Sequence, residues 1–194
     1  MKEEKDKLVA EIVHRVLTET GSVKAAAREI EKGVHLQPQI TLRLAVALLE
    51  RIEKRANELG MRIVAAVSDA AGRPVAIHCM DGAYIGSFDV ALNKTYTAIA
   101  FQMSTARLGE LAAPGQPLYG IQQTNEGKIV IFGGGEPLTA GDLEERSEEA
   151  DGSQTNIASE QIIGAIGVSG GTAEQDTYLA AYARSIVKEV VSCL

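Results

Sequence analysis

A histidine and a methionine lie two positions apart in the segment 74–80, which is predicted to be a strand. Because side chains alternate along a strand, His78 and Met80 share one face of it. An imidazole nitrogen and a thioether sulfur are both ligands of transition metals. The spacing makes His78 a candidate metal ligand, with Met80 as a second, soft ligand. The alternative is a histidine that hydrogen-bonds to a neighbouring strand or at a subunit interface.

Three basic side chains could pair with an anionic ligand. Lys94 lies in the middle of a predicted helix, Arg73 lies in a predicted turn, and Arg107 lies in the predicted short helix 104–111. Lysine and arginine form strong hydrogen bonds with carboxylates and phosphates. The alternative for Lys94 is a solvated helix face.

A glycine pair directly before the last predicted helix offers a second way to bind an anion. Backbone N–H groups of Ser169, Gly170 and Gly171 would lie at the N-terminus of that helix, where anions bind readily. The alternative is a tight strand-to-helix turn, because Thr172 and Gln175 have the spacing of a capping box.

Composition and motifs argue against several classes of function, namely nucleic-acid binding, catalysis by a known residue set and a membrane location. The formal net charge of −7 disfavours a nucleic-acid partner. His14, His35 and His78 are not clustered at metal-site spacing, and no serine or cysteine has a recognisable nucleophile context, so the sequence predicts no catalytic set. No stretch is long and apolar enough for a membrane span, and the charged N-terminus has no signal-peptide core. We therefore expect a cytoplasmic protein without a membrane partner.

The chain divides into a short N-terminal extension and one larger domain. Residues 1–21 are predicted to form an amphipathic helix, because Leu8, Ile12 and Val16 recur every four positions. Residues 22–39 are predicted to be a linker with a short helix, and residues 40–194 the domain. An isolated helix of this length is marginal in water, so it must pack on something. The alternatives are packing within its own oligomer and docking as an encapsulation peptide of a bacterial microcompartment.

The domain shows helical and strand periodicities in a mixed order. Predicted helices are 41–59, 87–103, 104–111 and 173–191, and predicted strands are 63–68, 74–80, 121–124, 128–132 and 161–169. The tight turn 69–73 joins the first two strands as a hairpin. The glycine-rich segment 133–137 is predicted to be a loop, and the acidic segment 139–159 a solvated insertion. This order predicts an α/β (α+β) fold with an antiparallel sheet of about five strands flanked by helices.

Several segments, taken in order, resemble the GlcG/HbpS family, which includes the C-terminal domain of PduO. They are VSDAAG (67–72), IHCMD (77–81), ALNKTYTA (91–98), GGGEPL (133–138), IGAIGVSGGT (163–172) and EQD (174–176). The resemblance spans about residues 40–190. The chain departs from the family pattern at residues 139–159, where the acidic segment replaces a short turn.

The resemblance implies a profilin-like fold and a homo-oligomer. It also implies haem binding, with haem degradation in some members, so that His78 becomes a candidate ligand of haem iron. The link to PduO makes a corrinoid the alternative tetrapyrrole and suggests a microcompartment setting. Three functions follow as hypotheses: a haem-binding accessory protein, a haem-degrading enzyme, or a structural or cargo protein of a microcompartment with shell or cargo partners bound through residues 1–21.

Overall fold

The computed structural model describes residues 37–143 and 160–194. The expectations for the helix 1–21, for most of the linker 22–39, for His14 and His35, and for most of the acidic insertion lie outside these residues. Residues Pro38–Leu194 are one compact unit.

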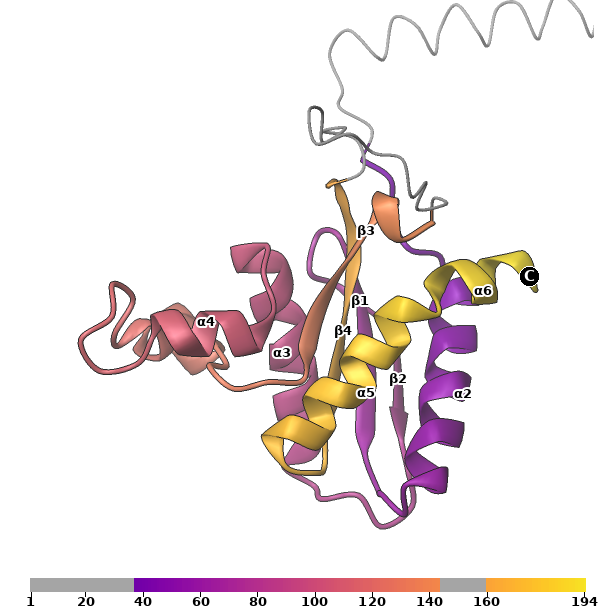
Figure 1. The fold of residues 1–194 in the computed structure, drawn as a ribbon, viewed down its shortest axis with the longest axis horizontal. Helices are drawn as coiled ribbons and strands as arrows, with labels where there is room; N and C mark the ends of the chain where they lie inside the picture. The colour runs from indigo at the N-terminus through magenta and orange to yellow at the C-terminus, as the bar shows by residue number, and fades with distance from the viewer. Residues whose placement is uncertain (1–36, 144–159) are drawn as a thin grey trace, which may run out of the picture. The chain divides into compact units, whose positions relative to one another are not determined.

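The centre of this unit is a four-stranded sheet. Strands β1 (Val64–Asp69) and β2 (Pro74–Cys79) are joined by the turn, and β3 (Gly135–Thr139) and β4 (Ile162–Ser169) follow later in the chain. The spatial order is β2-β1-β4-β3, and every neighbouring pair is antiparallel (Figure 1). The predicted mixed fold with an antiparallel sheet is therefore confirmed, with four strands in place of about five.

Two of the predicted strands are wrong. Residues 121–123 form a short 3-10 helix, followed by a second one at Asn125–Gly127. Residues 128–132 are buried at Ile129 and Val130 but pair with no strand, and the Val130 N–H donates to the Thr97 hydroxyl at 3.0 Å. A side chain of a helix thus provides the partner that a neighbouring strand would have supplied.

The fourth strand instead begins inside the predicted glycine-rich loop. Gly135 pairs with Gly167, and the ladder continues to Thr139. A Cβ atom at Gly135 would lie 2.8 Å from the backbone oxygen of Lys94. The glycine therefore lets the strand lie directly against a helix, which is a known reason for glycine in strands.

Helices cover both faces of the sheet. Helices α2 (Leu42–Glu58) and α5 (Ala173–Ser185) pack on one face, where the larger apolar core includes Ala65 and Val67 of β1. Helix α3 (Ser87–Phe101) packs on the other face, beside Val64 and Ala66 (Figure 1). The alternation of β1 side chains between the two cores follows from strand geometry.

The remaining helices are short. Helix α4 (Thr105–Leu111) follows α3, and a one-turn 3-10 helix covers Ala140–Leu143. The last predicted helix is divided into α5 and α6 (Val187–Ser192) at Ile186, whose ψ of 1° ends the regular helix. Close packing of α3 on the sheet depends on Gly167, where a Cβ atom would lie 2.1 Å from the Ala91 oxygen.

The β1–β2 turn is held by one carboxylate. Asp69 accepts hydrogen bonds from the backbone N–H groups of Ala71 (2.9 Å) and Arg73 (3.0 Å) and from the Arg73 guanidinium (2.9 Å). Burial by itself would raise the pKa of Asp69, but these hydrogen bonds outweigh it and hold the pKa below its usual value of 3.8.

We predict that Asp69→Asn removes part of the pH dependence of stability. Because the native state lowers the pKa of Asp69, its stabilising contribution is complete above the unfolded value and is lost as the pH falls through the folded value. Urea unfolding from about pH 6 down to about pH 2.5 should therefore show a less stable variant at neutral pH and convergence with wild type in acid. Asp81→Asn, at an exposed position after β2, is the control. Parallel pH profiles for wild type and Asp69→Asn would contradict this assignment.

Candidate functional site

His78 lies on β2, at one edge of the sheet. It pairs with Ala65 of β1, and its side chain is half-buried on the face covered by α2. Its Nδ1 atom lies 3.0 Å from a carboxylate oxygen of Glu53, which belongs to α2. An ionised carboxylate only accepts hydrogen bonds, so this contact fits a ring that carries a proton on Nδ1. Among the described residues, nothing hydrogen-bonds to Nε2, which leaves that nitrogen available to a ligand.

A cavity of about 380 Å³ lies beside this pair, between α2 and the end of β2. It is lined by Glu53, Asn57, Arg62, Cys79, Met80 and Asp81. Met80 packs partly against the main core, and Cys79 is an exposed free thiol. The guanidinium of Arg62 donates to the Asn57 side chain at 2.9 Å and to the Met61 carbonyl at 3.2 Å. The cavity thus combines a thioether, a thiol, an amide and a cation with the carboxylates of Glu53 and Asp81.

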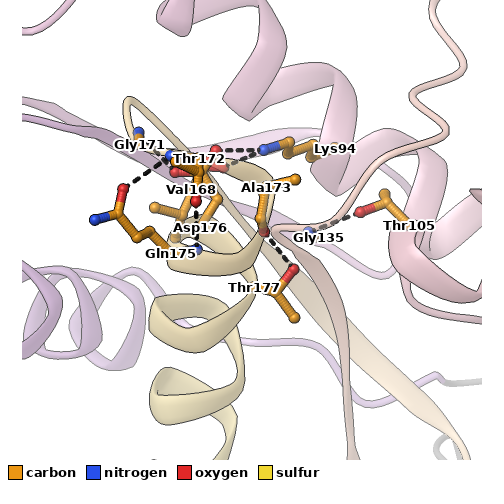
Figure 2. A network of polar contacts seen from close by, with 10 residues as sticks. All are labelled: Lys94, Thr105, Gly135, Val168, Gly171, Thr172, Ala173, Gln175, Asp176 and Thr177. Carbon is orange, nitrogen blue, oxygen red and sulfur yellow. Dashed lines mark hydrogen bonds and ion pairs between the residues drawn. The ribbon is translucent and has the colours of Figure 1, made fainter.

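Lys94 lies elsewhere and is fully buried. Its amino group donates to the Asp176 carboxylate at 2.8 Å and to the Val168 carbonyl at 2.7 Å, as Figure 2 shows. It also lies 4.9 Å from the centre of the Phe132 ring, a cation–π contact. Burial lowers the pKa of Lys94, and the hydrogen bond and charge of Asp176 oppose that shift. The solvated-face alternative for Lys94 is therefore wrong.

The glycine pair before α5 belongs to the same network (Figure 2). The Gly171 N–H donates to the second carboxylate oxygen of Asp176 at 2.9 Å. The Thr172 N–H donates to the Gln175 side chain, and Thr172 accepts from the Gln175 N–H, which completes the predicted capping box. Ser169 is buried, and Gly170 has a φ of +147°. The chain's own side chains therefore take up donors at the helix N-terminus that an anion would need.

The predicted candidates thus fall into two separate groups. Met80 lines the edge cavity and His78 contacts Glu53 at its wall, whereas Lys94 and the segment 169–171 form an internal network. The other basic candidates already have carboxylate partners: Arg73 pairs with Asp69, and Arg107 pairs with Glu110.

Two larger cavities lack metal-ligating imidazoles. One of about 570 Å³ contains Arg184, whose guanidinium pairs with both Glu136 and Asp142. Burial raises the pKa of Glu136, with Arg184 opposing. The other, of about 620 Å³, is a shallow apolar surface that includes Phe132 and Tyr178. The edge cavity is therefore the best candidate site for a metal-centred ligand.

A protein-only metal site is not found within residues 37–143 and 160–194, where no three His, Cys, Asp or Glu side chains are grouped to hold an ion. In the same residues, no helix is long and apolar enough to cross a membrane.

Three residues of these sites were missed by sequence reasoning. Glu53 and Arg62 reach the edge cavity from α2 and the segment after it, and Asp176 reaches Lys94 from α5. The pairs are separated by 25 residues for Glu53 and His78 and by 82 for Lys94 and Asp176. The EQD motif at 174–176 was noted for the family resemblance, but no local signal identifies the partner of its aspartate.

The protein is a mixed α/β domain with a four-stranded antiparallel sheet and helices on both faces. A half-buried imidazole lies at one edge of the sheet. Residues 40–145 match the family described as haem degrading protein HbpS-like. The chain belongs to this family.

Curated relatives agree with this assignment. A 15.0 kDa protein of the dhaT-dhaS intergenic region of Citrobacter freundii is 37% identical over 151 residues, covering 78% of this chain and 94% of that protein. The corrinoid adenosyltransferase PduO of Salmonella typhimurium is 32% identical over 127 residues, covering 66% of this chain but only 32% of PduO. The likeness to PduO is thus confined to about a third of that enzyme.

Solved structures share the fold. The ORFY protein of Klebsiella pneumoniae is 36% identical with a TM-score of 0.68, covering 84% of this chain and 97% of that chain. A complex of PduOC with heme is 28% identical with a TM-score of 0.63, covering 76% of this chain and 94% of that chain. A structure of HbpS, at 20% identity and a TM-score of 0.64, covers 80% of this chain and 94% of that chain and supports the fold alone.

We predict that the buried ion pair is strongly coupled. Lys94→Met leaves the Asp176 carboxylate buried without its cation and should cost about 3–5 kcal/mol of unfolding free energy. Adding Asp176→Asn should recover at least about 1 kcal/mol, because the amide needs no counter-charge and still accepts from Gly171. Urea midpoints of the two single variants and the double variant measure this coupling. Lys128→Met, which removes an exposed lysine, is the control and should change little. Additive losses in the double variant would show that the two charges do not depend on each other.

Proposed function

We propose that this protein binds haem as an accessory protein, acting as a sensor, scavenger or cofactor supplier. The observation that carries the proposal is the His78 imidazole, whose Nδ1 is held by Glu53 while Nε2 has no hydrogen-bond partner among the described residues. Neutral imidazole nitrogen is a common axial ligand of haem iron. Membership of the HbpS-like family and the likeness to a heme complex of PduOC support the same ligand.

Two residues of the edge cavity, Met80 and Arg62, fit a tetrapyrrole in chemical type. Met80 provides a thioether, which serves as an axial ligand in some haem proteins. Arg62 provides a guanidinium that can pair with a propionate. Lys94, whose charge is compensated by Asp176, is in contrast a poor partner for a propionate. Bound haem would supply an iron centre, and the residues of this chain would orient and bind it.

Haem degradation is the alternative activity, and the description of the family supports considering it. The described residues contain no group that sequence or geometry marks as a catalytic acid, base or nucleophile. Turnover of bound haem is what separates the accessory role from the enzymatic one. Spectral decay of bound haem in the presence of a reductant would favour degradation instead.

The first test is a titration of the full chain with haemin, followed by absorbance in the Soret region. Wild type should bind saturably, and His78→Ala should weaken binding by at least about tenfold, since loss of even an outer partner of a metal ligand costs 10–100-fold. Met80→Leu, which keeps the volume, should have a smaller effect. Met103→Leu is the matched control, because Met103 lines the 570 Å³ cavity instead.

Each other outcome has a defined meaning. Binding that is unchanged in His78→Ala but weakened in Met103→Leu would move the ligand to the larger cavity. Saturable binding of a corrinoid but not of haemin, in the same titration, would replace haem by the alternative tetrapyrrole. Absence of binding to both would overturn the proposal and leave a structural or cargo role.

We also propose that the protein forms a homo-oligomer and is located in the cytoplasm, associated with a bacterial microcompartment. The relatives that support a link to cobalamin metabolism are the corrinoid adenosyltransferases named PduO. The amphipathic pattern of residues 1–21 is the candidate docking segment for shell or cargo proteins. The acidic net charge supports neither a nucleic-acid partner nor a role at an anionic surface.

Deletion of residues 1–21 tests the docking role. We expect the shortened chain to keep the sedimentation behaviour of the full chain and to lose co-purification with microcompartment shell proteins. Unchanged co-purification would rule out docking through this segment. Loss of the oligomer would assign the segment to self-association instead.

A further inference from the structure

The contact between Glu53 and His78 joins two elements that the sheet and core hold in place. Glu53 follows Ile52, which is fully buried in the main core together with Leu49 and Ala56 of the same helix. His78 is fixed by its pairing with Ala65 in the β1–β2 ladder. The 3.0 Å contact thus joins two elements held by the core and the sheet, and it forms without a ligand.

We infer that Glu53 is a positioning residue for His78: it holds the proton on Nδ1 and so presents Nε2 as a strengthened ligand for the iron of a tetrapyrrole. This inference rests on the proposed function and deepens it, because it assigns the residue that tunes the ligand. Metal-ligating histidines commonly donate their second N–H to a carboxylate, which sets the tautomer and raises the basicity of the coordinating nitrogen.

The solvent exposure of the pair favours a role in ligand binding over one in stability alone. The side chains of His78 and Glu53 are 26% and 33% exposed, so the pair lies at the rim of the core. A polar contact this accessible to water contributes little to stability. Glu53 also lines the edge cavity beside Met80, which places the carboxylate next to the space that a ligand would occupy.

The ring tautomer provides a test that needs no haem. In wild type, nitrogen NMR of His78 in its neutral form should show a protonated Nδ1 and an unprotonated Nε2. Glu53→Ala should shift the population toward the Nε2-protonated form, whereas Glu53→Gln should keep the wild-type tautomer, since its amide oxygen still accepts a hydrogen bond. Glu50→Gln, an exposed glutamate on the same helix, is the matched control and should change nothing.

Haemin binding then tests the effect on the ligand. Glu53→Ala should weaken haemin affinity by about 10–100-fold, and Glu53→Gln should fall between Glu53→Ala and wild type. The reduction potential of the bound iron should rise in Glu53→Gln, because the neutral amide donates less electron density through the imidazole. Thermal unfolding of each variant separates these effects from loss of fold.

The outcomes distinguish this inference from the proposed function. If His78→Ala loses haemin while Glu53→Ala keeps wild-type affinity and potential, haem binding stands and the positioning role is overturned. An unprotonated Nδ1 in wild type, or the same tautomer in Glu53→Ala, also overturns it. If wild type binds no haemin, the proposed function and the tuning of iron fail together, and the NMR result alone decides whether Glu53 orients the ring.

Discussion

The buried ion pair between Lys94 and Asp176 is the interaction on which the arrangement of the domain depends. It joins α3, on one face of the sheet, to the start of α5, on the other, and it also ties Lys94 to the end of β4 through the Val168 carbonyl. Burying two charges is costly unless the geometry satisfies them. Asp176 meets this condition by also accepting from the Gly171 N–H.

The buried Lys94–Asp176 pair also requires glycine at neighbouring positions, because a side chain there would occupy its space. A Cβ atom at Gly134 would lie 2.6 Å from the Lys94 amino group and 2.7 Å from the Asp176 side chain. Gly135 lies equally close to the backbone of α3. In the segment predicted to be a loop, Gly134 therefore leaves room for the buried Lys94 amino group, and Gly135 begins β3. Phe132 packs near the lysine and completes its surroundings.

The edge cavity is positioned by this framework but does not share its charges. The charges of Lys94 and Asp176 neutralise each other, so the internal network neither attracts nor repels a charged ligand at the edge cavity. At the edge, Glu53 of α2 and His78 of β2 are instead exposed to solvent in part, and Arg62, between α2 and β1, lines the cavity. The Lys94–Asp176 pair is shielded from water and is structural, whereas the His78–Glu53 pair is partly exposed to water and can contact a ligand.

The sequence by itself determined the elements whose signal is local. The apolar face of α2, the hairpin of β1 and β2 with its Asp69 turn, and the capping box of α5 all depend on residues a few positions apart, as does the placement of His78 and Met80 at one strand end. Only the tertiary structure decided the rest. The start of β3 at Gly135 depends on contact with α3, and residues 128–132 form no strand, with the Val130 N–H bonded to Thr97 of α3. The partners Glu53 and Asp176 lie far from His78 and Lys94 in sequence, and a contact between distant residues is set by packing rather than by local pattern.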